Sequence, residues 1–457
     1  MRSDAARPYR PWALPWLLAA AGFAFDLVAW WPGQMSFDSA YAWWQARGGT
    51  GSDIVPPGFM FAWRACLALA DGPGMLFGLH LTLFWCGLAL FARSLSRSGI
   101  ATAALMLLAG FAPVSLLLRG HAWTDVALFS ALVFVSGALA SARADGRRGW
   151  LAAALPALLY AAVVRHNALP AVLPFCAWWS WIALGGARGK VARAPLASAT
   201  AALVLLAIGT SRLLATQVER HVPLWPLAAE YDLVAVSIAT DRIRLPDFMY
   251  GPGLDVQELR AAFREWSALP MLTGTRHGLR QAFEPPLDAV ELAQLKRAWF
   301  DTVVDEPMAW LRHRARVSRA LFGTHARDWP RGLVYEDSEA TFGDNPPVAP
   351  NAGVLHAALM RLADGAASTA WLAAWPCLAL GLFALPLAWR WRRTMRSDAA
   401  LLLLASAWLY ALPLCALTAS AELRYLGWPC VASLLAFGCM VFGACASASA
   451  EQAAVRA

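Results

Sequence analysis

Charged side chains are scarce in this sequence. Asp, Glu, Lys and Arg make up 15% of its 457 residues and hydrophobic residues make up 59%, whereas a typical soluble chain is about a quarter charged and about half apolar. The mean hydropathy of +0.48 agrees with this imbalance. The composition therefore excludes a soluble protein of two or three domains and indicates a membrane protein.

Cysteine frameworks and nucleic-acid-binding patterns are lacking as well. The eight Cys residues lie in or beside apolar segments without the spacing of a zinc motif, so we expect neither a disulfide framework nor a zinc site. The net charge of +8 comes without an aromatic platform for RNA, so we expect no nucleic acid among the partners. The first apolar segment is too long for a cleavable signal peptide, and no small-residue cleavage site follows it.

Long apolar runs are what the sequence does contain. Each has roughly 18 or more nearly uncharged residues, which is enough for a helix to cross a hydrocarbon core of about 30 Å. We therefore predict an all-α polytopic membrane protein with about ten transmembrane helices, embedded among membrane lipids. The predicted spans are 11–31, 74–92, 99–118, 125–142, 150–164, 168–184, 196–215, 370–389, 399–418 and 425–445.

Basic residues determine the predicted orientation. If the N-terminus is cytoplasmic, every Arg-rich loop falls on the cytoplasmic side, as the positive-inside rule requires, and the C-terminus is cytoplasmic too. One miscounted helix would break this alternation, so the agreement also supports the number of spans. The loop residues concerned are Arg93, Arg97, Arg143, Arg147, Arg148, Arg188, Lys190, Arg193, Arg390, Arg392, Arg393 and Arg396.

The remaining loops fall on the opposite, exoplasmic side, and one of them is long enough for a domain. We divide the chain into an N-terminal membrane module (1–215), a mainly helical periplasmic loop domain (216–369) and a C-terminal membrane module (370–457). The modules hold about seven and about three of the spans. In the loop domain we predict helices at 256–267 and 287–304, a basic amphipathic helix at 308–322 and an irregular stretch at 328–351.

The first exoplasmic segment, 32–73, carries Asp38 only a few residues after the first span. Short surface helices are predicted at 39–47, ended by two glycines, and at 58–70. Asp38 fits the N-cap of the first of these helices, where Asp is favoured. It also fits a carboxylate that takes a proton from an acceptor hydroxyl. The two roles are compatible, because capping fixes the side chain without using both oxygens.

Two further carboxylates have both a structural and a functional interpretation. Asp53 fits either a turn ahead of two prolines or a site. Asp125 stands at the head of the fourth predicted span, where a capping carboxylate also suits the helix dipole. His121 and Trp123 lie beside Asp125 in the same short turn, and their presence favours a site there.

The third exoplasmic turn consists of Arg165, His166 and Asn167 between two apolar runs. An unpaired charge is costly at the membrane edge. Arg165 therefore requires an anionic partner, which is a protein carboxylate, a lipid headgroup or a substrate phosphate.

The fifth exoplasmic turn poses the same question, because Arg424 either pairs with the nearby Glu422 or binds an anionic ligand. Tyr425 follows in the same turn. Within the spans, Asp26 is a site candidate because intramembrane carboxylates are commonly functional, or its side chain reaches the nearby interface. His80, in mid-span, fits a hydrogen-bonded packing residue better than a ligand.

Together these residues describe an exoplasmic cavity of carboxylates, arginines and aromatic rings, and their order resembles the GT-C superfamily of polytopic glycosyltransferases. That order is an Asp soon after the first helix, two surface helices, and a second Asp at the head of the fourth helix. The chain is similar to a bacterial group of GT-C-like membrane proteins. The motifs are PGQMSFDS at 32–39, Ser52-Asp53 with Pro56-Pro57, Trp123-Thr124-Asp125, Arg165-His166-Asn167, Glu422-Leu423-Arg424-Tyr425, and Trp299 with Glu306-Pro307, Trp310-Leu311 and Arg314.

The resemblance implies transfer of a sugar from a polyprenyl-phosphate carrier to an acceptor on the periplasmic side of a bacterial inner membrane. It implies that Asp38 acts as general base or orienter and that a cationic side chain holds the lipid phosphate, for which Arg165 and Arg424 are candidates. The catalytic candidates are Asp38 and Asp125, and the substrate-binding candidates are Asp53, His121, Trp123, Arg165, His166, Asn167, Glu422, Arg424 and Tyr425.

Two positions depart from the family pattern. Val55 stands where His is expected before the double Pro, and Thr124 stands where Lys is expected between Trp and Asp. Both changes remove a potential cation or metal ligand. We therefore assign no metal ligands and do not favour a divalent metal as cofactor, and we consider His121 as a replacement cation.

Two other classes of protein share parts of this pattern. A transporter or flippase for a lipid-linked substrate predicts polar residues distributed through the spans, whereas here they gather at one face. An O-antigen polymerase or ligase-like enzyme also combines a large periplasmic loop with essential Arg residues. That class would leave Asp38 dispensable and Arg424, or an Arg of the loop, essential.

Overall fold

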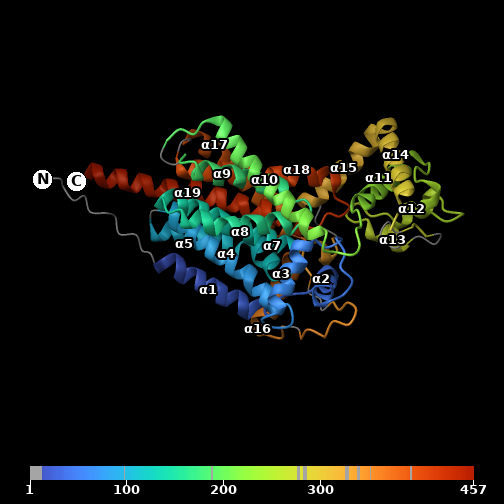
Figure 1. The fold of residues 1–457 in the computed structure, drawn as a ribbon, viewed down its shortest axis with the longest axis horizontal. Coiled ribbons are helices and arrows are strands. Elements are labelled where there is room, and N and C mark those ends of the chain that lie inside the picture. The colour runs from blue at the N-terminus through green and yellow to red at the C-terminus, as the bar shows by residue number, and fades with distance from the viewer. Residues whose placement is uncertain are drawn as a thin grey trace.

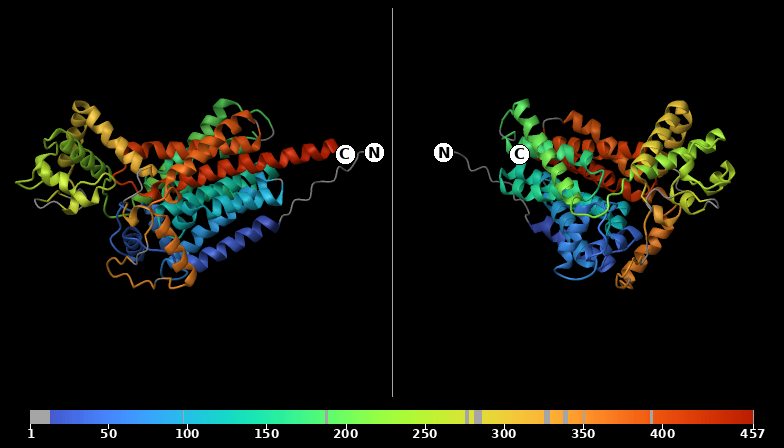
Figure 2. Two further views of the ribbon diagram at one scale, coloured as in Figure 1. Left: turned by 180° about the vertical axis from the view of Figure 1, so that it is seen from behind. Right: turned by 45° about the vertical axis from the view of Figure 1, so that its right-hand side comes forward.

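The computed structural model describes residues 13–96, 98–186, 189–274, 278–280, 286–324, 329–336, 340–349, 351–391 and 394–456. Helices make up 73% of the chain and no β-strand forms in these residues, so the predicted all-α class is confirmed. Long, roughly aligned helices form a bundle, and a group of shorter helices projects from one end of it (Figure 1). Two further views show the same separation (Figure 2).

Six helices in the described residues are long and apolar enough to cross a membrane, which supports the predicted multi-pass membrane character. They are α1 (Ala13–Trp30), α4 (Gly74–Leu95), α7 (Thr124–Asp145), α10 (Arg193–Ala215), α18 (Met395–Leu417) and the segment Leu423–Phe442, which comprises η5 (Leu423–Leu426) and the first part of α19 (Gly427–Arg456).

The other predicted spans correspond to helices of fewer than 18 residues, which are individually shorter than the six helices above. The helices α5 (Gly99–Phe111) and α6 (Pro113–Arg119) make a seventh candidate span if they are counted together, although they are bent by 58°. The bend coincides with Pro113, which is tolerated only in the first turn of a helix. The apolar helices α8 (Gly149–Val163), α9 (Leu169–Ala183) and α17 (Ala374–Arg390) are shorter.

Arg-rich loops meet at one end of the bundle. Arg143, near the end of α7, pairs with Asp398 in the first turn of α18 at 2.7 Å. The side chain of Arg396 donates to the carbonyl of Leu95, at the end of α4, at 2.9 Å. The segments predicted to be exoplasmic lie at the opposite end, together with the group of shorter helices (Figure 1).

Two buried polar residues of the bundle, Asp26 and His80, have hydrogen-bond partners on other helices. Arg119 donates to both oxygens of Asp26, at 2.8 and 3.1 Å, and both side chains are fully buried. Trp85 Nε1 donates to the same carboxylate at 2.7 Å. Asp26 therefore belongs to a buried ion pair inside the bundle. His80 bonds the hydroxyl of Tyr160 at 2.8 Å, as expected for a packing residue.

The segment 32–73, which is predicted to be exoplasmic, forms the two predicted helices, α2 (Phe37–Arg47) and α3 (Pro57–Leu67). The prediction that Asp38 caps α2 is wrong, because the N-cap is Ser36, whose hydroxyl accepts a backbone N–H at 3.4 Å. Asp38 instead lies in the first turn, where its charge still suits the helix dipole. The helix ends at Gly48, whose φ of +121° favours glycine.

Residues 225–322 form a helical unit with its own hydrophobic core. Two of its predicted helices are present, whereas the helix predicted at 256–267 ends early and no helix was predicted at α11. On α15 the apolar residues Met308 and Leu311 are exposed, and His313 and Arg314 are buried. The helices are α11 (Trp225–Thr240), α12 (Val256–Ala262), α13 (Leu269–Gly274), α14 (Ala289–Asp305) and α15 (Pro307–Phe322).

The chain after α15 returns to the bundle. In the described parts of the stretch predicted to be irregular, the regular structure is one turn, η3 (Arg331–Leu333). Tyr335 belongs to the core of the bundle, and so does Met360 on α16 (Val354–Ala366). The stretch 216–369 therefore contains a separate helical unit, 225–322, and a second part that packs on the bundle.

Candidate functional site

Charged residues from four separate loops meet at the end of the bundle that carries α2. Asp38 comes from the first exoplasmic segment, Asp125 from the start of α7 and Arg165 from the turn between α8 and α9. Glu422 and Arg424 come from the turn before α19. These five residues, which we name the charged cluster, are among those predicted as site residues, and the contacts below bring them together.

Arg424 forms the first half of the charged cluster. Its Nη2 donates to Oδ2 of Asp38 at 2.6 Å, and its Nε donates to Oε2 of Glu422. The other oxygen of Glu422 accepts from the hydroxyls of Ser420 and Tyr425, at 3.1 and 3.2 Å. The predicted pairing of Arg424 with Glu422 is therefore present, and a second carboxylate shares the same guanidinium.

Arg165 forms the second half of the cluster. Its Nη1 lies 2.5 Å from Oδ2 of Asp125 and donates to the hydroxyl of Thr124 at 3.2 Å, and its Nε donates to Asn167 at 3.0 Å. Burial alone would lower the pKa of Arg165, but the Asp125 carboxylate outweighs it and the pKa is raised. The N-cap of α7 is Trp123, and Asp125 lies in the first turn of the helix. The Oδ1 atom of Asp125 has no hydrogen-bond partner in the described residues. The predicted capping by Asp125 is wrong.

Aromatic rings lie against both guanidinium groups. The ring centroid of Tyr425 is 5.1 Å from Cζ of Arg165 and 5.4 Å from Cζ of Arg424. Arg424 also lies 4.9 Å from the ring of Trp123. Contacts of this length are favourable cation–π interactions. The two halves of the cluster therefore share one aromatic residue, Tyr425.

Hydrogen bonds join the segment 32–73 to the turn before α7 beside the cluster. Trp123 Nε1 donates to the hydroxyl of Ser36 at 2.8 Å. The hydroxyl of Ser39 donates to the carbonyl of Ala122 at 2.9 Å. Because Ser36 also caps α2, these bonds fix the helix that carries Asp38 against the turn that leads into α7.

His121 is enclosed by the protein. Its ring stacks on that of Trp123 with centroids 3.8 Å apart, its Nδ1 donates to the carbonyl of Leu117 at 3.1 Å, and its Nε2 lies 2.8 Å from the carbonyl oxygen of Glu336. Burial lowers the pKa of His121 to about 4. His121 is therefore uncharged at neutral pH, which argues against the replacement cation considered above.

Asp53 and His166 lie outside these contacts. Asp53 accepts from the backbone N–H of Val222 at 2.6 Å and from Nδ1 of His221 at 3.0 Å. His166 Nε2 donates to the carbonyl of Ile54 at 3.3 Å. These bonds fasten the first loop to the segment after α10 and to the turn between α8 and α9. They favour a structural role for both residues over the predicted role in substrate binding.

The charged cluster contains three carboxyl groups and two guanidinium groups. The exposures of the partners differ: the side chain of Asp38 is 59% exposed and that of Arg424 is 13% exposed. Asp38 is therefore the partner that can leave Arg424 with the least loss of packing. In the described residues no three His, Cys, Asp or Glu side chains are placed to hold a metal ion.

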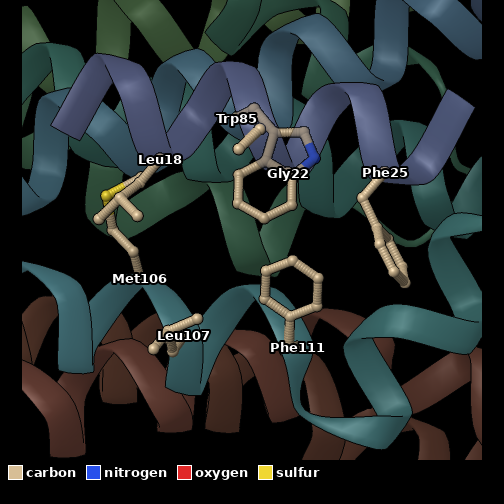
Figure 3. A pocket seen from close by; sticks show the side chains of 8 residues that line it. Leu18, Gly22, Phe25, Trp85, Met106, Leu107 and Phe111 are labelled. Atoms are coloured by element: carbon tan, nitrogen blue, oxygen red, sulfur yellow. The ribbon is translucent and has the colours of Figure 1, made fainter. Parts of the chain in front are cut away.

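A cavity of about 270 Å³ lies elsewhere, between α1, α4 and α5 (Figure 3). Its walls are apolar, and none of the predicted site residues lines it. Trp85 separates part of this space from the buried Asp26, to which its indole N–H is bonded. The lining residues are Leu18, Ala21, Gly22, Phe25, Trp85, Met106, Leu107 and Phe111.

Two buried polar residues, Ser36 beside the cluster and Asp232 in α11, were not singled out from the sequence. Ser36 was quoted only as part of a motif, although a Ser before an Asp-containing helix is a recognisable cap signal. Asp232 is buried in α11, and its signal is a pair of acidic residues, Glu230 and Asp232, in an otherwise apolar helix.

Comparison of the sequence with known protein families and with curated proteins gives no match. The fold and the site define the chain as a helical membrane protein with a charged cluster at one end of its bundle. Its function must therefore be argued from that cluster.

Proposed function

We propose that the chain is a GT-C-like membrane glycosyltransferase. It moves a sugar from a polyprenyl-phosphate carrier to an acceptor on the periplasmic side of the bacterial inner membrane. The observation that carries this proposal is the contact between Asp38 and Arg424, at 2.6 Å. The candidate base and the candidate phosphate ligand thus share one site, as group transfer requires, because base and leaving group act on the same carbon.

In the proposed reaction the acceptor hydroxyl oxygen attacks the anomeric carbon and Asp38 takes the hydroxyl proton. The bond between that carbon and the phosphate oxygen breaks, and its electron pair stays on the polyprenyl phosphate. Arg424 and Arg165 stabilise the negative charge of the leaving phosphate, since guanidinium groups form paired hydrogen bonds to phosphate oxygens.

The contacts of Arg424 give these steps an order. A phosphate can bind Arg424 favourably only if it replaces a carboxylate, and Asp38 is the more exposed of the two that Arg424 holds. Donor binding therefore displaces Asp38 and frees it to act as base. Glu422 stays bonded to Nε of Arg424 and keeps the guanidinium in place. Deprotonation of the acceptor thus follows donor binding.

The transfer is tested in membranes that contain a polyprenyl-phosphate sugar. Asp38→Asn should reduce transfer by about 10²- to 10⁴-fold, the usual contribution of a general base. Asp71→Asn is the matched control, because Asp71 lies in the same loop, is exposed and is 4.0 Å from its closest cationic partner, Arg47. Full activity of Asp38→Asn would overturn the base assignment. Full activity of Asp38→Asn together with loss of activity in Arg424→Ala would indicate a polymerase or ligase-like enzyme.

We also propose that the chain crosses the membrane ten times with both termini in the cytoplasm. Support comes from the correspondence of every predicted span with an apolar helix or helix pair, and from the meeting of the Arg-rich loops at one end. Alkaline phosphatase inserted between α12 and α13 should be active, and phosphatase fused after Gly146 should be inactive. The reverse pattern would overturn the orientation.

A further inference from the structure

The turn that carries the first half of the cluster is held by the helical unit 225–322. The backbone N–H of Ala268 donates to the carbonyl of Ala419 at 2.9 Å, and that of Ala421 donates to the carbonyl of Trp266 at 2.8 Å. Between these bonds, residues 267 and 420 pair in an antiparallel bridge. The turn from 418 to 424, here named the arginine turn, is thus attached to a segment that is more than 150 residues away in the chain.

A buried arginine makes a third attachment. Arg314, on α15, donates from Nη1 to the carbonyl of Thr418 at 2.6 Å, and its Nε lies 2.7 Å from Oδ1 of Asp232 on α11. Its side chain is only 6% exposed. One guanidinium therefore links the core of the helical unit to the first residue of the arginine turn.

Asp232 is itself fixed in place from two helices. Its Oδ2 accepts from the indole N–H groups of Trp299 and Trp310, at 2.8 and 3.0 Å. Burial alone would raise the pKa of Asp232, but His313 and Arg314 outweigh it and the pKa is lowered. Asp232 is therefore an anion with several donors, and it holds the Arg314 side chain in one orientation.

We infer that Asp232 and Arg314 are positioning residues for the charged cluster. They hold the arginine turn at Thr418 so that Arg424, six residues on, meets Asp38. Neither residue contacts the cluster itself. The inference rests on the proposed function for its consequence in catalysis, whereas its structural content, that Arg314 orders the arginine turn, can be measured independently.

The variant Arg314→Lys separates positioning from folding. Lys keeps a positive charge beside Asp232, but its single ammonium group cannot reproduce the geometry by which one guanidinium contacts both Asp232 and the carbonyl of Thr418. We expect transfer to fall about 10- to 100-fold, because a shift of about 1 Å in a group that binds the reacting centre has an effect of that size. Arg316→Lys is the control, since Arg316 is on the same helix and pairs with Glu265 at the surface.

A disulfide should rescue the variant. Antiparallel partners have Cα atoms about 4.5–5.5 Å apart, within the range that a disulfide spans. Ser267→Cys combined with Ser420→Cys attaches the arginine turn covalently to the same segment. In the Arg314→Lys background the oxidised protein should recover most of the transfer rate, and reduction should abolish the recovery. The double-Cys protein with Arg314 intact is the reference. If this reference is active and the oxidised Arg314→Lys version does not recover its transfer rate, the inference is overturned.

Hydrogen exchange gives a readout that does not depend on transfer. The amides of Ala268 and Ala421 should exchange faster in Arg314→Lys than in the unchanged chain, and Arg316→Lys should leave them unchanged. Unaltered exchange in Arg314→Lys would overturn the inference even if the chain is a glycosyltransferase. If the unchanged chain transfers no sugar but exchange rises as expected, the proposed function fails and the positioning role stands.

Discussion

Replacing Arg119 alone should destabilise the chain more than replacing both members of its buried ion pair. In Arg119→Met the carboxylate of Asp26 stays in a fully buried place with only the indole N–H of Trp85 as donor. Removing one partner of a buried pair costs about 3–5 kcal/mol. That is a factor of roughly 150 to 5,000 in the ratio of folded to unfolded protein.

The double variant, Asp26→Leu with Arg119→Met, removes the buried charge as well. What remains is the indole N–H of Trp85 without its acceptor, which costs about 1–3 kcal/mol. The free energy of unfolding is measured by equilibrium denaturation in mixed micelles, followed by helical circular dichroism. If the single and double variants lose the same stability, the charge of Asp26 is not buried in the way the structure shows. Normal stability with loss of transfer would place Asp26 in the site after all.

Three further perturbations test other parts of the structure. Gly137→Ala should lower the thermal midpoint, at a cost of about 1–3 kcal/mol, because the added Cβ would lie 2.2 Å from the carbonyl oxygen of Gly87 on the neighbouring helix. Gly78→Ala is the control and should leave the thermal midpoint unchanged, because its Cβ would meet no atom within 4 Å. Burial raises the pKa of Glu230 from 4.5 to about 8, so between these values the folded chain keeps a proton that the unfolded chain releases. The stability of the unchanged chain should therefore fall as the pH rises from about 5 to 8, and Glu230→Gln should remove this fall. Burial lowers the pKa of His121 from 6.5 to about 4, so the stability of the folded chain should fall as the pH drops from 6.5 to 4. Thermal melts recorded across this range should show that His121→Gln removes this part of the pH dependence.

Local features of the fold are predictable from the sequence because they depend on neighbouring residues. Hydropathy locates the apolar helices, and the glycine at position 48 marks the end of α2. Distant contacts are not predictable in this way. The pairing of Arg424 with Glu422 follows from their separation of two residues, whereas its contact with Asp38 spans 386 residues and depends on how the bundle closes.

Helical periodicity did not reveal which side chains α15 buries in the protein. Leu311 in its apolar stripe is 50% exposed, whereas Arg314 is buried. An arginine is buried only when an anion and acceptors compensate it, and here Asp232 and the carbonyl of Thr418 do so. Those partners lie on other elements, so the periodicity of one helix contains no information about them.

The contact between Asp38 and Arg424 has a consequence for biosynthesis. Translation proceeds from the N-terminus, so the segment that carries Asp38 is made long before the turn at 418–424. Until that turn is in place, Asp38 lacks the Arg424 guanidinium and Arg165 lacks the Tyr425 ring. The pair of Arg165 and Asp125 lies within the earlier part of the chain, so the arrival of the later turn adds the remaining half of the site.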